Sequence, residues 1–303
     1  MYQHLLVPLD GSVPAEAALA AARALVERAH MPVTLLHVVE TDAPPVTHAG
    51  RHLRAKAEAE AYLADVARRF FAPGMDVRCH VHTAASHDVA AEIAGHPFEL
   101  AADLVVMSPH GRGGFHGARL GNMAQQVLSL GHTPVLMVRN PGPSPETPWC
   151  PKVIFFPHAG DPVHERALPV AEEWTRLFGG LLKLVMVVPT TGTLGGVHGL
   201  AGTLLPGGSQ ELLDIEEQSA AREMETHVID MKGRGVEAEF DLRRGDPAEM
   251  LVQCAKASPP DLVIMGTHGR AGSKAFWNGS VAARLVTRLD CSCLLIPLDD
   301  TRR

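Results

Sequence analysis

The strongest constraint on this chain is an internal repeat. Residues 103–138 align without a gap with residues 261–296, at a spacing of 158 positions. The N-terminal parts of the two copies also align, at a shorter spacing, with Leu6–Pro8 opposite Phe155–Pro157. The long aligned block keeps three glycines in each copy: Gly111, Gly114, Gly121, Gly269, Gly272 and Gly279. A repeat of this length predicts two copies of one domain.

A proline-rich segment separates the two copies. Residues 140–148 have the sequence Asn-Pro-Gly-Pro-Ser-Pro-Glu-Thr-Pro, which suits neither a helix nor a central strand. We therefore predict one domain over residues 1–140 and a second over residues 152–303, joined by a linker at residues 141–151. A chain of 303 residues is long enough for two domains of ordinary size.

Each copy alternates short apolar runs with longer segments typical of helices. In the first copy we expect strands at 5–9, 33–39, 77–82, 103–107 and 135–138, and helices at 14–29, 53–71, 87–94 and from about 121. In the second copy we expect strands at 153–156, 181–188, 237–242, 261–265 and 293–296, and helices at 163–178, 211–231, 247–257 and from about 279. The alternation predicts an α/β fold, with a five-stranded parallel sheet of order 3-2-1-4-5 in each copy and helices on both faces. Such sheets bind ligands where the strand order reverses, at the carboxyl ends of the first and fourth strands.

Composition excludes several classes of protein. Hydrophobic residues make up 46% and charged residues 20%, which is typical of a folded globular chain. We expect no membrane span, because the sequence has no apolar run of about 18 residues. We expect a cytoplasmic location, because no basic segment precedes the first apolar run. The net charge of −7 argues against nonspecific binding to nucleic acid.

The loop after the fourth strand of the second copy carries a glycine pattern. Gly266, Gly269, Gly279 and Ser280 are spaced as G-x2-G-x9-G-S, and a predicted helix follows. Glycines let a ligand approach the backbone closely, and a helix N-terminus offers free N–H groups and a positive dipole end. The hydroxyl of Ser280 can add a hydrogen bond, and Arg270 can add positive charge. The pattern therefore suits phosphate.

This loop, with a first strand that ends Val-Pro-Leu-Asp-Gly-Ser at residues 7–12, resembles the universal stress proteins. The resemblance covers nearly the whole chain and implies two tandem Rossmann-like domains of the adenine nucleotide α-hydrolase-like type. It implies that ATP binds with its phosphates on the glycine loop, with AMP or ADP as alternatives and Mg²⁺ as a companion. In the second copy the implied binding residues are Pro157, His158, Val187, Met265, Gly266, His268, Gly269, Arg270, Gly279, Ser280 and Val281. In the first copy they are Pro8, Asp10, Val38, Gly111, Gly121 and Asn122.

The two copies depart from the family pattern in complementary ways. In the first copy Ser108 and Asn122 replace a glycine and the serine of the loop, whereas Asp10 is retained. In the second copy the loop is intact, but Ala159 stands where the aspartate of the first strand is expected. Because the loop holds the charged part of the ligand, we expect ATP mainly in the second copy. Adenosine or AMP suits the first copy better.

Three functions remain open at this stage. The first is an ATP-binding stress-response protein that is regulatory and at most weakly hydrolytic, because no activated nucleophile stands out. The second is a nucleotide-free scaffold protein, since both copies depart from the pattern. The third, an enzyme that forms an adenylated intermediate, would need a Ser-Gly-Gly-x-Asp-Ser loop that the sequence lacks. The family resemblance also implies that residues 135–138 pair with residues 293–296 as an intrachain pseudo-dimer, and a further homodimer is open.

Other motifs have ordinary explanations. His80 and His82 lie on one face of a predicted strand, but no third ligand is evident, so we favour a solvated or packed strand face and predict no metal site. Cys291 and Cys293 do not form a CxxC pair, so we do not expect zinc there either. The glycine-rich insertion at residues 191–209 is either a lid or, as we favour, a loop without a role.

Overall fold

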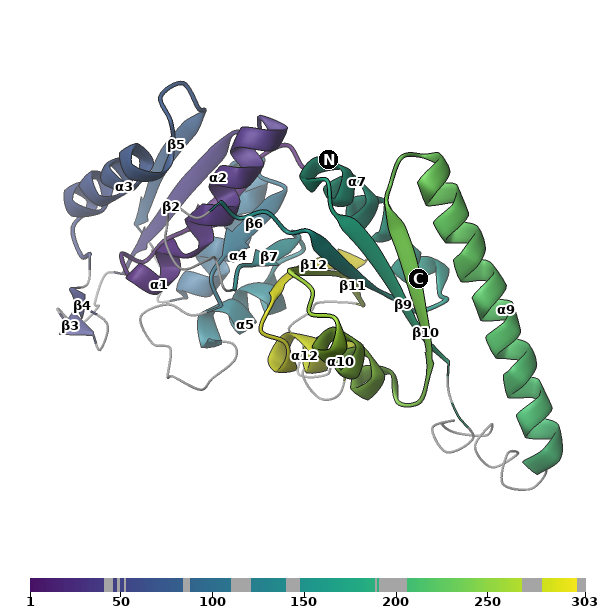
Figure 1. Cartoon of the computed structure of the whole chain (residues 1–303). Helices are drawn as coiled ribbons and strands as arrows, with labels where there is room; N and C mark the ends of the chain where they lie inside the picture. Colours follow the sequence, from purple (N-terminus) through teal and green to yellow (C-terminus); the bar gives the residue numbers. More distant parts are fainter. Residues whose placement is uncertain are drawn as a thin grey trace. The chain divides into compact units, whose positions relative to one another are not determined.

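The computed structural model describes residues 1–40, 46–47, 50–51, 53–83, 88–109, 121–139, 148–188, 190, 206–268 and 280–298 (Figure 1). The chain divides into two compact units. One contains residues 1–150, 267–278 and 290–303, and the other contains residues 151–266 and 279–289. Within the described part of the chain, we find no helix with the length and apolar character needed to cross a bilayer.

The first unit is built on a sheet whose strand order confirms the prediction for the first copy. Its strands are β1 (Leu5–Pro8), β2 (Val33–Val39), β5 (Val77–Thr83), β6 (Leu104–Met107), β7 (Val135–Met137) and β12 (Ser292–Leu298). They are arranged β5-β2-β1-β6-β7-β12, and the first five are parallel in the predicted order 3-2-1-4-5. Strand β1 is central because its leucines and valine are wholly buried, as both faces of a parallel sheet require.

The predicted pairing of the two C-terminal strands is present. Strand β12 runs antiparallel to β7, with Leu294 opposite Leu136. The hydroxyl of Ser292 donates to the carbonyl of Arg139 at 3.0 Å and accepts from the amide of Arg139 at 3.1 Å. The pairing covers the β7 edge, which would otherwise present free backbone groups.

The described part of the first unit contains five helices. They are α1 (Val13–Glu16), α2 (Ala18–Ala29), α3 (Lys56–Phe70), α4 (Val89–Glu99) and α5 (Asn122–Leu130). Helix α2 packs with α3, and α4 packs with α5. The sequence did not predict the two-stranded hairpin formed by β3 (Val46–Thr47) and β4 (Gly50–Arg51). These strands have only two residues each, too few for a periodic pattern.

The second unit repeats the arrangement of strands 1–4, whereas the predicted fifth strand of the second copy, β12, belongs to the first unit. The strands of the second unit are β8 (Val153–His158), β9 (Leu181–Val188), β10 (Ala238–Arg244) and β11 (Leu262–His268). They lie in the parallel order β10-β9-β8-β11, which is 3-2-1-4. The helices are α6 (Pro162–Glu165), α7 (Leu168–Phe178), α9 (Pro206–Gly233), α10 (Pro247–Ala257) and α12 (Val281–Arg288). Both α9 and α10 pack on β9 and β10 (Figure 1).

The first helix of each copy is divided, whereas the sequence predicted one continuous helix. Helix α1 ends before Ala17 and α2 follows at once, and α6 and α7 are separated in the same way by Arg166 and Ala167. The backbone hydrogen bonds at these junctions span three residues, as from Ala17 to Pro14 and from Ala167 to His164. Such tight, 3₁₀-like spacing interrupts the regular α-helical ladder.

The aspartates that begin the long repeat have the same structural role in both copies. The carboxylate of Asp103 accepts from the amides of Gln3 and His4 at 2.8–2.9 Å. The carboxylate of Asp261 accepts from the amides of Lys152 and Val153 at 2.8 and 2.9 Å. Each aspartate therefore fixes the start of the strand next to its own, which is β1 or β8.

We expect Asp261→Ala to lower the free energy of unfolding of the second unit by about 1–2 kcal/mol, because two amides lose a charged acceptor. Hydrogen exchange of the β8 amides measures the change within this unit, because a single denaturation curve of a two-unit chain does not isolate it. Asp76→Ala is the control, since the exposed carboxylate of Asp76 pairs with Arg78 on the surface and such pairs contribute at most about 1 kcal/mol. Equal losses in the two variants would contradict the assigned role.

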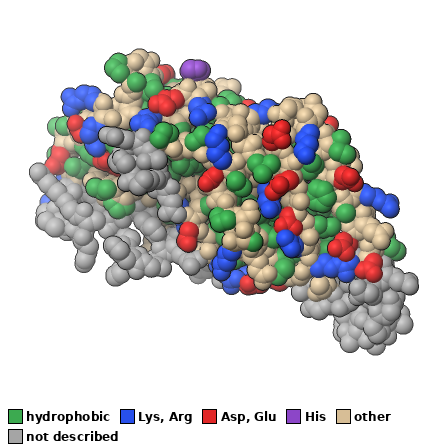
Figure 2. Space-filling model, in the orientation of Figure 1, with side chains coloured by type: hydrophobic (Ala, Val, Ile, Leu, Met, Phe, Trp, Pro, Cys, Tyr) green, Lys and Arg blue, Asp and Glu red, His purple; other side chains and the backbone are tan. Residues whose placement is uncertain are grey.

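Charged side chains of both signs are interspersed on the face shown in Figure 2. Ion pairs are frequent among the described residues; Glu249, for example, pairs with Arg284 at 2.7 Å and with Arg288 at 2.6 Å. These contacts hold the pKa of Glu249 below its usual value, chiefly through the hydrogen bond from Arg288. The visible part of the surface therefore shows no continuous basic stripe.

Candidate functional site

The second unit contains the predicted reversal of strand order. Strand β8 lies between β9 and β11, with Ile154 opposite Leu262 on one side. Because all three strands are parallel, their carboxyl ends share one edge of the sheet. Three of the predicted binding residues lie near that edge: Pro157, Val187 and Met265. Met265 is buried, whereas Pro157 and Val187 are half-buried.

The N-terminus of α12 is the second part of this site. Ser280 is its cap, and the hydroxyl oxygen of Ser280 accepts from the amide of Ala283 at 3.1 Å. The first turn carries no acidic side chain, so no carboxylate of the turn neutralises the positive end of the helix dipole. The amide of Val281 belongs to the first turn and has no partner within the helix. This end of α12 is suited to an anion.

In the first unit the equivalent helix begins differently. Gly121 is the cap of α5, which starts at Asn122, and no side chain supplies a cap hydrogen bond. The amide of Gly121 donates to the carbonyl of Pro109 at 2.8 Å. Val38, the counterpart of Val187, is buried with 7% of its surface exposed. The first copy therefore has no counterpart of the Ser280 cap, and its valine is less accessible than Val187.

The turn after the first strand uses a side-chain acceptor in both copies. Asp10 lies just beyond Pro8, and its carboxylate accepts from the amide of Ser12 at 2.9 Å. In the second copy Nδ1 of His158 accepts from the amide of Gly160 at 3.2 Å. His158, one position before Ala159, therefore supplies the side-chain acceptor of this turn.

The imidazole of His158 is buried and belongs to a group of titratable side chains. Its Nε2 is 3.7 Å from a carboxylate oxygen of Glu165, and its ring centroid is 5.3 Å from that of His227. Burial, and next the neighbouring His227, lower the pKa of His158, whereas Glu165 and Glu223 oppose this shift. The neutral ring is consistent with Nδ1 acting as an acceptor.

Several predicted features lie outside the described residues. They are Gly111, Gly269, Arg270, Gly279, most of the predicted linker and residues 191–205 of the glycine-rich insertion. Residues 206–209 of that insertion belong to α9. His268 is the last residue of β11, and its side chain is not described.

Sequence reasoning missed one histidine. His80 and His82 do lie on one strand, but α4 brings His96 to them, with ring centroids 5.3 and 4.5 Å away. Burial, followed by the proximity of His96 and His82, lowers the pKa of His80. A third potential ligand, which was not evident from the sequence, therefore lies beside this pair. No spacing rule links a strand residue to a residue of the following helix, so only the packing of α4 reveals His96.

Comparison with known proteins gives a consistent result. A model of the universal stress protein family matches residues 1–139 and 152–297. The universal stress protein Sll1388 of Synechocystis is 32% identical over 82 residues, which are 27% of this chain and 53% of that protein. The universal stress protein MJ0531 of Methanocaldococcus jannaschii is 31% identical over 86 residues, 28% of this chain and 49% of that protein. This chain thus spans about half the length of the curated relatives it matches.

Solved structures resemble the chain over nearly its whole length. A putative universal stress protein from Pseudomonas aeruginosa has a TM-score of 0.71 at 16% identity, covering 99% of this chain and 94% of that one. A universal stress protein from Archaeoglobus fulgidus has a TM-score of 0.68 at 15% identity, covering 98% and 97%. At these identities the likeness is one of fold.

Proposed function

This chain belongs to the universal stress protein family, and we propose that it binds an adenine nucleotide, chiefly ATP, in its second copy as a regulatory stress-response protein. The observation that carries the proposal is the intact G-x2-G-x9-G-S pattern, which leads into the N-terminus of α12 with Ser280 as the cap. Free amides and a positive dipole end at that position suit the phosphates. Mg²⁺ would accompany ATP there, and the protein would act in the cytoplasm.

The described geometry supports the second copy over the first. Val187 is half-buried at the end of β9 and leaves apolar surface for an adenine, whereas Val38 is buried. Gly266 places no side chain at the strand end, where the first copy has Ser108. The adenine would then lie near Pro157 and Val187, with the phosphates toward α12.

The described residues also favour regulation over catalysis. The oxygen of Ser280 accepts from a backbone amide, and Nδ1 of His158 does the same. Neither side chain forms part of a nucleophile and base pair. We therefore propose binding with at most slow hydrolysis.

Calorimetric titration of the full-length chain with ATP and Mg²⁺ tests this proposal. The expected result is a single site per chain with a micromolar dissociation constant. Two equal sites would contradict the preference for the second copy. Absence of binding would favour the alternative of a nucleotide-free scaffold, and turnover like that of a dedicated ATPase would contradict a regulatory role.

A further inference from the structure

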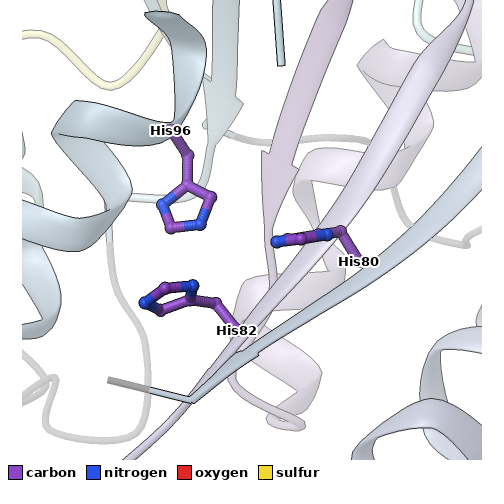
Figure 3. Close-up of side chains that lie close together, drawn as sticks. All are labelled: His80, His82 and His96. Carbon is purple, nitrogen blue, oxygen red and sulfur yellow. The ribbon is translucent and has the colours of Figure 1, made fainter. Parts of the chain in front are cut away.

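Three histidines converge in the first unit, and none of them is among the residues implicated in nucleotide binding. His80 and His82 are two positions apart on β5 and therefore project from the same face of the sheet. Helix α4 supplies His96, and the three rings point toward one another (Figure 3). One potential ligand atom from each residue lies within 4.8 Å of the others.

The hydrogen bonding of His96 leaves a buried lone pair aimed at the other two rings. Nδ1 of His96 is 2.6 Å from the backbone carbonyl of Glu92. A carbonyl can only accept, so Nδ1 carries the proton and Nε2 carries the lone pair. His96 is 1% exposed, and among the described residues its Nε2 has no hydrogen-bond partner; a carboxylate oxygen of Glu99, which can only accept, lies 4.0 Å away. A buried acceptor without a donor is expected where a cation completes the site.

Glu92 orients a second ring of the cluster. Its carboxylate is 3.2 Å from Nε2 of His82, so that the proton of His82 is held on this nitrogen and Nδ1 is left as the potential ligand. Metal-binding histidines usually donate their other N–H to a carboxylate or a carbonyl in this way. The side chain of His82 is 30% exposed, so an ion can reach the cluster from solvent.

We propose that His80, His82 and His96 bind Zn²⁺ through three neutral imidazoles, with the fourth position open to water. Three nitrogen ligands and one open position suit this ion. Zinc–nitrogen bonds of about 2.0–2.1 Å place bound nitrogens about 3.3 Å apart. The three potential ligand atoms now lie within 4.8 Å of one another, so the side chains would rotate to bring them to that distance when Zn²⁺ binds.

A second group of potential ligands fits a metal less well. It contains His158, Glu165, Glu223 and His227 in the second unit. Nδ1 of His158 already accepts from the amide of Gly160, so its lone pair is in use and Nε2 carries the proton. Binding through Nε2 would require that proton to leave or that hydrogen bond to break. This group therefore serves as the control site.

Titration of the untagged, EDTA-treated full-length protein with ZnSO₄ tests the proposal. Calorimetry gives the affinity, and Co²⁺ in place of Zn²⁺ gives visible d–d bands that report imidazole ligation. The variants are His80→Ala and His82→Ala, whose side chains are half-buried and leave the buried His96 in place. His227→Ala, in the control site, is the matched variant. Circular dichroism confirms that each variant is folded.

The expected result is one Zn²⁺ site that weakens roughly 100-fold or more in His80→Ala and in His82→Ala. The site should be unchanged in His227→Ala. Glu92→Ala should weaken it about 10–100-fold, because His82 loses the partner that orients it. Absence of Zn²⁺ binding by the wild type would overturn the proposal. So would a site that survives in His82→Ala, or one that is lost only in His227→Ala.

Discussion

A Gly279→Asp, Ser280→Ala variant should bind ATP at least about 100-fold more weakly than the wild type, a loss of about 2.7 kcal/mol in binding free energy. The new carboxylate would stand just before α12, where it repels phosphate and competes for the free amides of the first turn. The second substitution removes the hydroxyl of Ser280, which caps α12 at the proposed phosphate site. Calorimetry on both proteins measures the difference.

The repeat supplies a matched control for this experiment. Gly121→Asp, Asn122→Ala makes the equivalent change before α5 in the first copy and should leave the ATP site intact. Loss of the cap at Ser280 lowers stability by about 0.5–2 kcal/mol, so circular dichroism must show that both variants are folded. Equal loss in the two variants, or loss in the first-copy variant alone, would contradict binding in the second copy.

The central strands could be predicted because buried parallel strands are mostly apolar over their whole length. Both β2 and β9 have the predicted limits, Val33–Val39 and Leu181–Val188. The helical breaks at Ala17 and Ala167 could not be predicted, since these alanines favour helix and the breaks arise from backbone hydrogen-bond spacing. Local sequence carries little information about such spacing.

The candidate site could be predicted only where the chain order determines it. A parallel sheet of alternating elements brings the ends of its first and fourth strands together. The family resemblance implied Pro157 and Met265 as binding residues, and the strand order explains why both come near that edge. The acceptor role of His158 and the approach of His96 depend on side-chain orientation and helix packing. A histidine carries no signal for either in the sequence. His158 was therefore implied as a nucleotide-binding residue without its role in the turn, and His96 was overlooked.

The core of the second unit depends heavily on one aromatic residue. Trp174 of α7 is 1% exposed, and its ring centroid is 6.0 Å from that of Phe178. Helix α7 packs on β8 and β9, the strands that carry Pro157 and Val187. Loss of this side chain would leave a cavity beneath the sheet that supports the proposed nucleotide site.

Trp174→Ala should lower the free energy of unfolding of the second unit by about 3–5 kcal/mol, through lost burial and the cavity. Phe98→Ala is the control, because Phe98 is 95% exposed and its loss should change stability by no more than about 0.5 kcal/mol. Hydrogen exchange of the β8 and β9 amides measures the effect within this unit, which a single denaturation curve of a two-unit chain does not isolate. Exchange that accelerates equally in β1 and β2 would mean that the two units unfold together, and unchanged exchange in β8 would contradict a central role for Trp174.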